Sequence, residues 1–262
     1  MIDYHVHTRL CNHAEGAMEA YIKKAVDIGL EEICFLDHLT IRESEKQLSM
    51  TKEEVPFYFQ AVKFLRQRYK KKIKVKAGLE IDFNPEYTDI FHEIVETYSF
   101  DVIGSSLHFL KGMDIVSRHS DWAHGKIDPD YVFGLYLEQL ENMLEYDYFD
   151  VICHIDLAKK FGAKPSRTFD GEFDTVLSKI KNRGLAVELN TSGYVHPCNE
   201  VYPAFLLLKK CHEKGISITL GSDAHNPESM GRRFDSALSM LRLAGYRRIA
   251  TFSRRRQSSI PI

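Results

Sequence analysis

IDYHVHTRLCNHAEGAMEAYIKKAVDIGLEEICFLDH, residues 2–38, contains a complete strand–helix–strand pattern. Its two ends, 2–7 and 31–38, are short and mostly apolar, as buried strands are, and residues 17–30 carry apolar side chains at helical spacing. Gly29 stands at the end of the helical segment, where a residue with left-handed backbone commonly releases the chain. Strands joined through a helix run parallel within one sheet, so this stretch predicts a βα unit.

Apolar segments of strand length alternate with amphipathic segments through the rest of the chain. Further strands are predicted at 73–83, 100–109, 149–156, 185–193, 216–225 and 246–253, and further helices at 51–71, 85–98, 129–146, 173–184, 204–215 and 236–245. A doubly wound open sheet would give the same alternation, but seven or eight consecutive units favour a (β/α) barrel of eight strands or fewer. The loop 111–128 is longer than ordinary connections, and long loops on such scaffolds often cover a site.

Length, composition and charge limit the class of protein. A chain of 262 residues with 44% hydrophobic content can bury one large core, so we expect a single domain over residues 1–262. Lys plus Arg (35) nearly balance Asp plus Glu (37), and a net charge of -2 favours neither nucleic acid nor a membrane surface as a partner. The N-terminus has no secretory pattern, and no run of about 18 apolar residues occurs. We therefore expect a cytoplasmic protein with a small-molecule ligand; the oligomeric state stays open.

Residues that bind metals recur at the C-terminal ends of the predicted strands. His5 and His7 are two positions apart at the end of the first strand, so both side chains point to the same face and can reach one ion. The later strands end in turn with His38, Glu80, His108, His154, Asn190, and Asp223 together with His225. In barrel enzymes these strand ends build the active site, so we expect the side chains to converge on one pocket.

Each of these residues has an ordinary structural explanation when it is taken alone. A single histidine is commonly a buried or surface residue with satisfied hydrogen bonds, and Glu80 alone would suit a buried ion pair. Asp223 and His225 would suit the cap of the following helix. Residues with such roles would scatter over both ends of the strands, whereas these gather at one end, which favours a metal site.

The ligand types indicate the class of metal and of reaction. His13, in the first loop, is a further candidate ligand beside the histidine pair. Imidazole and carboxylate without thiolate suit catalytic zinc, iron or manganese, and Glu80 is the central carboxylate able to bridge two ions. Paired ions that share a water promote phosphoryl transfer, so the pattern indicates a hydrolase. Four other histidines fall on predicted helix surfaces or in the long loop: His92, His212, His119 and His124.

Eight short motifs, in this order, resemble the polymerase-and-histidinol-phosphatase (PHP) family, and more closely its stand-alone histidinol-phosphatase branch. They are DYHVHT (3–8), CNHAEG (11–16), FLDH (35–38), AGLEIDF (77–83), IGSSLHFL (103–110), CHID (153–156), ELNTSG (188–193) and TLGSDAHNPESMG (219–231). The resemblance spans nearly the whole chain. It implies a distorted (β/α)7 TIM-like barrel, the PHP fold, that holds three divalent metal ions.

The resemblance also implies a ligand set and a reaction. The first ion would take His5, His7, Glu80 and Asp223, the second Glu80, His108 and His154, and the third His13, His38 and His225. A metal-bound hydroxide would attack phosphorus in line while the ions stabilise the phosphoryl oxygens, with Asp223 among the catalytic residues. The substrate of this branch is L-histidinol phosphate, which gives L-histidinol and phosphate in histidine biosynthesis.

One position departs from the pattern of the family. Members commonly carry an arginine after NTSG, whereas this chain has Val195 in its place and His196 beside it. His196 is a candidate for holding the phosphate or for protonating the leaving oxygen. The other candidate substrate contacts, in loops or at a strand end on the same side, are Arg167, Arg233 or its neighbour Arg232, and Asn190.

Three functions are compatible with these patterns. The first is a phosphatase of L-histidinol phosphate, and the second is a PHP phosphoesterase of another phosphomonoester or of a nucleotide phosphodiester. The third is a metal-binding protein without turnover, which fits poorly with ligands contributed by every strand around an open mouth. The resemblance over the full length and the lack of a basic groove favour the monoester.

Overall fold

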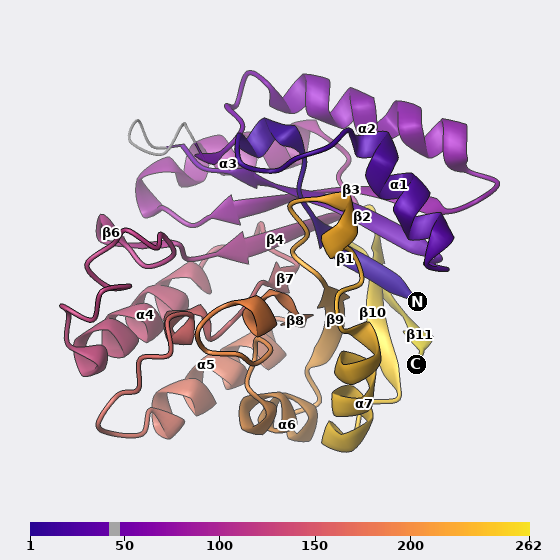
Figure 1. The fold of residues 1–262 in the computed structure, drawn as a ribbon. Helices are drawn as coiled ribbons and strands as arrows, with labels where there is room; N and C mark the ends of the chain where they lie inside the picture. Colours follow the sequence, from indigo (N-terminus) through magenta and orange to yellow (C-terminus); the bar gives the residue numbers. More distant parts are fainter. Residues whose placement is uncertain (42–47) are drawn as a thin grey trace.

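The computed structural model describes residues 1–41 and 48–262. Seven strands pair in parallel in the order β1-β2-β3-β4-β7-β8-β9 and form a nearly closed barrel at the centre of the molecule (Figure 1). The predicted (β/α)7 architecture is confirmed. The strands are β1 (Ile2–Val6), β2 (Glu32–Leu39), β3 (Lys74–Asp82), β4 (Val102–Ser106), β7 (Val151–Ile152), β8 (Ala186–Asn190) and β9 (Ser217–Gly221).

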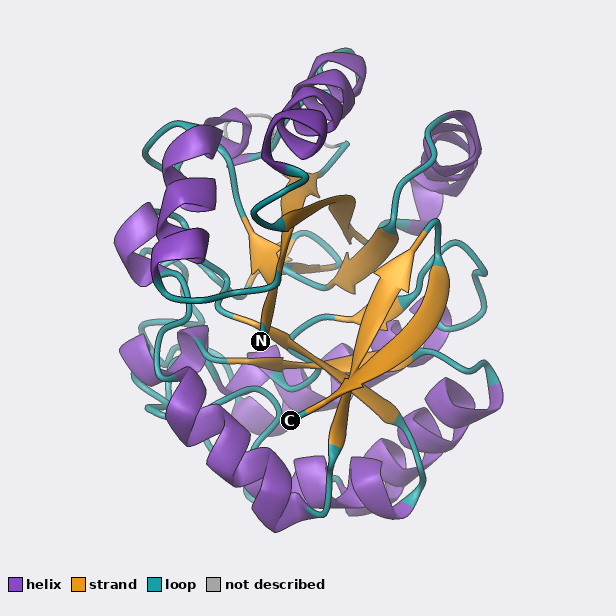
Figure 2. Cartoon of the chain, turned by 90° about the vertical axis from the view of Figure 1, so that its right-hand side faces the viewer, coloured by secondary structure: helices purple, strands orange, loops and turns teal. Residues whose placement is uncertain are grey.

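A helix follows each of these strands and covers the outside of the barrel (Figures 1 and 2). Each helix buries its apolar side chains against the strands, as Tyr21, Ile22 and Ala25 of the first helix do. In the described part of the chain, no helix has the length and apolar content that crossing a membrane requires. The helices are α1 (Met18–Asp27), α2 (Val55–Tyr69), α3 (Thr88–Thr97), α4 (Pro129–Met143), α5 (Asp170–Asn182), α6 (Phe205–Glu213) and α7 (Phe234–Ala244).

The barrel interior is packed tightly around Gly78 and Gly104, two glycines within its strands. A Cβ atom on Gly78 of β3 would lie 2.7 Å from the carbonyl oxygen of Val102 on β4. A Cβ atom on Gly104 of β4 would lie 2.7 Å from Sγ of Cys153. Glycine normally weakens a strand, so its presence at these positions marks close approach of neighbouring backbone and side chains.

The barrel closes at the end where the predicted ligands lie. The backbone N–H of His7 donates to the carbonyl of Ala224 at 3.0 Å, and the N–H of Ala224 donates to the carbonyl of His5 at 3.2 Å. Below this pair, the carboxylate of Asp3 accepts hydrogen bonds from the backbone N–H and the hydroxyl of Ser222 at 2.9 and 2.5 Å. The first and last barrel strands are therefore fixed to each other beside the candidate site.

The last predicted strand does not add an eighth unit to the barrel. Instead, β10 (Arg248–Ser253) pairs antiparallel with β11 (Arg256–Pro261) in a separate two-stranded sheet. The backbone N–H of Phe252 on β10 donates to the hydroxyl of Tyr4 on β1 at 3.0 Å, and the hydroxyl of Thr219 on β9 donates to a carbonyl of β10 at 3.1 Å. The hairpin thus spans the seam between β1 and β9 and occupies the place where a further barrel strand would pair.

The crowding at Gly78 gives a test of the packing. Replacing Gly78 by Ala should lower the free energy of unfolding by about 1–3 kcal/mol, because the added methyl group meets the backbone of β4 and cannot move away. At Gly171, near the start of α5, a Cβ atom would meet no other described atom within 4 Å, so Gly171→Ala is the control and should leave stability unchanged or raise it slightly. Chemical denaturation followed by circular dichroism measures both; equal stability of the two variants would contradict the packing argument.

Candidate metal centre

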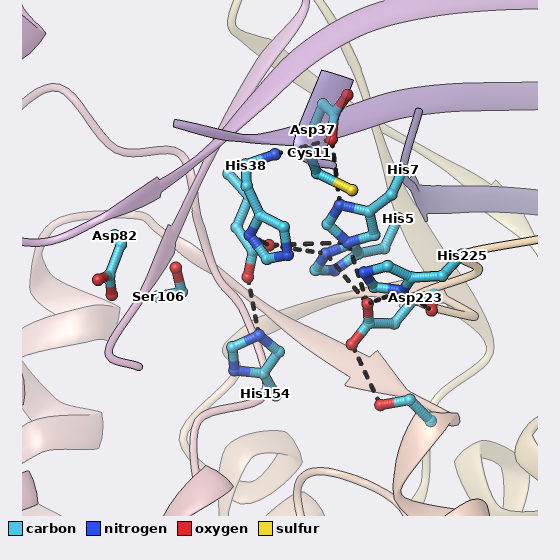
Figure 3. Close-up of polar contacts among 12 residues, drawn as sticks. His5, His7, Cys11, Asp37, His38, Asp82, Ser106, His154, Asp223 and His225 are labelled. Atoms are coloured by element: carbon cyan, nitrogen blue, oxygen red, sulfur yellow. Dashed lines mark hydrogen bonds and ion pairs between the residues drawn. The ribbon is translucent and has the colours of Figure 1, made fainter. Parts of the chain in front are cut away.

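All nine predicted metal ligands gather at the C-terminal end of the barrel around Glu80, which is fully buried. Glu80 lies in β3 in register with His38 of β2. In Figure 3 the rings of His7, His38 and His225 lie next to one another, and His154 lies below them and points toward the same centre. Parallel strands therefore deliver their terminal side chains to one place, as the sequence pattern predicts.

One oxygen of Glu80 faces three imidazoles. Glu80 Oε2 lies 2.8 Å from Nδ1 of His38. The same oxygen lies 3.3 Å from Nε2 of His5 and 3.7 Å from Nε2 of His7. His5 and His7 both point inward from β1, as expected for positions two apart on a strand. A cation at this side of the carboxylate would find imidazole nitrogens from two strands.

The other oxygen of Glu80 faces two further imidazoles. Glu80 Oε1 lies 2.8 Å from Nε2 of His154 and 3.7 Å from Nε2 of His108. His154 follows β7 with a φ of 27°, a left-handed backbone that is strained for a residue with a side chain. The two carboxylate oxygens thus serve two separate groups of nitrogens, which is the arrangement that a bridging carboxylate requires.

Asp223 and His225 follow β9 and close the remaining side of the centre. Asp223 Oδ1 lies 3.0 Å from Nε2 of His7 and 3.8 Å from Nε2 of His5. Asp223 also has left-handed backbone, with a φ of 54°. The ring of His225 stacks between those of His7 and His13, with centroid distances of 4.0 and 4.6 Å. These contacts bring His13 from the first loop into the group.

Burial and mutual contact prepare these groups to bind a cation. Burial alone would raise the pKa of the Glu80 carboxyl, but the imidazoles of His38 and His5 hold it well below its usual range. Burial lowers the pKa of His7 to about 3, and the neighbouring His38 adds to this effect. Burial likewise lowers the pKa of His13, His108 and His225. Burial alone would also lower the pKa of His5 and His38, but Glu188 and Glu80 hold the pKa of these two imidazoles above its usual range. At neutral pH the centre therefore contains an ionised carboxylate and several neutral imidazoles, the forms that metals bind.

Nε2 of His5 and Nε2 of His225 are among the buried ring nitrogens at the centre that have no hydrogen-bond partner within the described residues. A buried polar atom without a partner costs free energy, so natural proteins rarely keep one without a reason. A divalent metal ion would satisfy both atoms, and a donor set of imidazole and carboxylate suits zinc, iron or manganese. The residues present therefore fit a metal centre.

A cleft of about 570 Å³ opens above the centre and is large enough for a small ligand. The hairpin of β5 (Phe109–Leu110) and β6 (Met113–Asp114) and the rest of the long loop form one wall. Six predicted ligands contribute to the lining: His13, His38, His108, His154, Asp223 and His225. Basic or titratable side chains at the mouth are Arg118, Lys160, His196 and Arg232.

The predicted substrate contacts differ in where the structure places them. His196 lines the cleft, but Arg167 and Arg233 do not. Arg167 is exposed, stacks on the ring of Phe169 at 3.6 Å and pairs with Glu172 at 2.7 Å. Arg233 is also exposed and lies over the ring of Tyr194. The structure therefore does not bring these two arginines to the cleft, because each packs on an aromatic ring outside it.

Asn190 is fully buried beneath the centre instead of lining the cleft. Its Nδ2 donates to Asp223 Oδ2 at 3.3 Å, and its Oδ1 accepts from the N–H of Ser192 at 2.8 Å. The Ser192 hydroxyl also donates to Asp223 Oδ2, at 3.1 Å. Asn190 thus holds the carboxylate of Asp223 in place and does not reach the cleft as a substrate contact would.

Several residues of the site were not predicted from the sequence. Glu188 and Asp37 are buried carboxylates that contact His5 and His7 from outside the centre, with the shorter contact at 2.6 Å. Glu188 lies two positions before Asn190, so strand alternation places both side chains on one face, and this signal was present in the sequence. Lys160 lies in an irregular segment where no periodicity indicates which way a side chain points.

Comparisons with known proteins extend over the whole barrel. The family model of the PHP domain matches residues 3–192. A probable histidinol-phosphatase of Deinococcus radiodurans is 32% identical over 258 residues, which cover 98% of this chain and 98% of that protein. The histidinol-phosphatase of Lactococcus lactis is 24% identical and is matched over 96% of this chain and 94% of its own length. The same fold occurs in a crystal structure of histidinol phosphate phosphatase from Lactococcus lactis, complexed with zinc, L-histidinol and phosphate. The TM-score is 0.85 and the sequence identity is 23%, and the match covers 98% of this chain and 98% of that chain.

The position of Glu80 between two groups of imidazoles gives a test of its bridging role. Replacing Glu80 by Ala should remove two metal ions per chain, because both groups lose their shared carboxylate. Metal content after dialysis, measured by inductively coupled plasma mass spectrometry, gives the result. Replacing the exposed Glu53 by Ala is the control and should leave the metal content unchanged. Full metal content in a folded Glu80→Ala variant would defeat the bridging assignment.

Proposed function

The chain belongs to the PHP domain family, and from this membership we propose that it is a metal-dependent phosphatase that hydrolyses L-histidinol phosphate to L-histidinol and phosphate. The observation that carries the proposal is Glu80, a buried carboxylate with imidazoles at 2.8 Å on each of its two oxygens, below a cleft of ligand size. Two relatives that match nearly the full length carry the name histidinol-phosphatase. The proposal also assigns the protein to histidine biosynthesis in the cytoplasm, with residues 1–262 acting as one domain.

We propose three divalent ions, zinc, manganese or iron, at this centre. Zinc is the metal named with the Lactococcus lactis structure. When bound, such ions lower the pKa of a coordinated water and stabilise negative charge on phosphoryl oxygens. The proposed ligands are His5, His7, Glu80 and Asp223 for the first ion, Glu80, His108 and His154 for the second, and His13, His38 and His225 for the third.

The protein's own basic side chains would hold the phosphate at the mouth of the cleft. Val195 also lines the cleft, but its apolar side chain cannot bind an anion as an arginine at that position would. Lys160, Arg118 and Arg232 line the same cleft and supply the positive charge instead. Phosphate esters are bound well by such charged donors, because hydrogen bonds between ions are stronger than neutral ones.

The protonation state of His196 decides between its two expected roles, which are to bind the phosphate or to protonate the leaving oxygen. Burial lowers the pKa of His196 to about 4, and the positive charge of Lys160 adds to the effect. The imidazole is therefore neutral at pH 7 and carries one N–H, which suits a hydrogen bond to a phosphate oxygen. A proton donor to the leaving oxygen would need a pKa nearer to neutrality. We propose that His196 binds the phosphate and that Asp223 contributes to catalysis as a metal ligand.

Turnover of defined substrates tests the proposed function. Protein loaded with zinc, manganese or iron should release phosphate from L-histidinol phosphate faster than from other phosphomonoesters or from bis(p-nitrophenyl) phosphate. Removing the metals with EDTA should abolish this activity, and adding them back should restore it. Selective cleavage of the diester would instead make the protein a phosphodiesterase, and slow turnover of all esters alike would contradict a dedicated histidinol-phosphatase.

The basic mouth of the cleft generates a second expectation for the same assay. Replacing Lys160 by Ala should lower kcat/KM for L-histidinol phosphate by about 10- to 100-fold, since a hydrogen bond to a charged group contributes about 1.5–3 kcal/mol. Arg167→Ala is the matched control, because Arg167 is a basic residue outside the cleft, and it should change kcat/KM less than twofold. An equal loss in both variants would show that Lys160 has no specific part in phosphate binding.

A further inference from the structure

Glu188 of β8 carries a buried carboxylate that is not among the proposed metal ligands. The residue is 2% exposed, and its Oε1 lies 2.6 Å from Nδ1 of His5. Its Oε2 accepts a hydrogen bond from the backbone N–H of His154 at 3.0 Å and another from Nδ2 of Asn190 at 3.1 Å. The Glu188 side chain therefore contacts two proposed ligands, His5 and His154. It also contacts Asn190, which holds a third proposed ligand, Asp223.

The neighbouring strand leaves room for the contact between Glu188 and His5. A Cβ atom on Gly221, at the end of β9, would lie 2.2 Å from Oε1 of Glu188 and 2.6 Å from Cβ of His5. Any other residue at this position would push the two side chains apart. Glycine at the end of β9 therefore leaves the space in which the Glu188 carboxylate contacts the His5 imidazole. This close approach marks the contact as part of the packing of the barrel.

The contact determines which nitrogen of His5 faces the metal centre. With Nδ1 directed at Glu188, the ring presents Nε2 to Glu80 Oε2 at 3.3 Å and to Asp223 Oδ1 at 3.8 Å. An imidazole that donates its Nδ1–H to a carboxylate keeps its lone pair on Nε2 and becomes a more basic ligand. Nε2 of His5 is also one of the buried nitrogens without a hydrogen-bond partner in the described structure, so it is free to bind an ion.

Similar carboxylates stand behind two other imidazoles, but at greater distance. Asp37 Oδ1 lies 3.4 Å from Nδ1 of His7, and Asp82 Oδ1 lies 3.7 Å from Nδ1 of His108. Among these three pairs, the contact at His5 alone has the length of a charge-assisted hydrogen bond. Of the three carboxylates, Glu188 therefore has the strongest hold on a ligand ring.

We infer that Glu188 is a positioning residue, which fixes the orientation and the protonated nitrogen of His5 and so raises the affinity of the centre for its first metal ion. The inference rests on the proposed function only in taking His5 as a metal ligand, and no substrate enters it. The same carboxylate also restrains the backbone of His154, whose φ of 27° needs support from its surroundings.

Zinc affinity of two variants tests this role. Glu188→Ala removes the acceptor for His5, and we expect zinc to bind about 10- to 100-fold more weakly at the tightest site, as measured by competition with a chromophoric chelator. Glu188→Gln keeps one oxygen that can accept from Nδ1 of His5, so it should recover part of the lost affinity. The ligand-field bands of the cobalt-loaded protein should shift in both variants, because these bands report the geometry of the ligands.

A matched control separates this role from general loss of a buried carboxylate. Glu32 is also buried, at 5% exposure, but it accepts a hydrogen bond from the hydroxyl of Tyr4 at the opposite end of the barrel strands. Glu32→Gln should leave the zinc affinity and the cobalt spectrum unchanged. A loss of zinc affinity in Glu32→Gln to the same degree as in Glu188→Gln would overturn the inference.

The outcomes for Glu188 and for the proposed function can be told apart. Wild-type zinc affinity and an unshifted cobalt spectrum in a folded Glu188 variant would overturn the positioning role. If Glu188→Ala does not fold, Glu188→Gln is tested by the same criterion, because glutamine has nearly the same volume as glutamate. A protein that shows the expected variant effects on zinc but does not hydrolyse L-histidinol phosphate would contradict the proposed function and support the role of Glu188.

Discussion

Glu80 places a carboxylate at the centre of the barrel, where both of its oxygens face imidazoles and neither reaches water. An isolated buried carboxylate would cost several kcal/mol, so it persists only among groups that compensate its charge. Burial alone would lower the pKa of His5 and His38, but the neighbouring carboxylates raise it, so these two imidazoles supply the compensating charge. Burial lowers the pKa of other imidazoles at the centre, as the value of about 3 for His7 illustrates. The carboxylate and the imidazoles therefore depend on each other, and both become more stable if divalent cations occupy the space between them.

The architecture of the barrel follows from the need to bring these groups together. Parallel strands end on the same side, so residues far apart in the sequence meet without long connections. Asp3 and the backbone around Ala224 join the first strand to the last at this same end, and the β10–β11 hairpin spans the seam beyond them. His154 and Asp223, which both have left-handed backbone, lie at the centre, where surrounding hydrogen bonds can hold them.

Much of this arrangement could be predicted from the sequence, and the exceptions have physical reasons. Residues at strand ends were predictable because alternation fixes the face of a side chain and a parallel sheet fixes its edge. The same alternation could have indicated Glu188, two positions before Asn190. The sequence pattern alone left open whether residues 246–253 form an eighth barrel strand, because a barrel strand and a hairpin strand have the same apolar pattern.

Loop residues were harder to predict, because no period fixes their direction. Arg167 and Arg233 lie on the correct side of the barrel in sequence order, but each is turned outward by contact with an aromatic ring. Arg118 and Lys160, from irregular segments, take the places at the cleft instead.

Zinc-specific anomalous diffraction from crystals of the zinc-loaded protein tests the central claim most directly. The account predicts zinc peaks on both sides of the Glu80 carboxylate, one beside His5 and His7 and one beside His108 and His154. Zinc peaks only elsewhere on the molecule, with none in contact with Glu80, would contradict it.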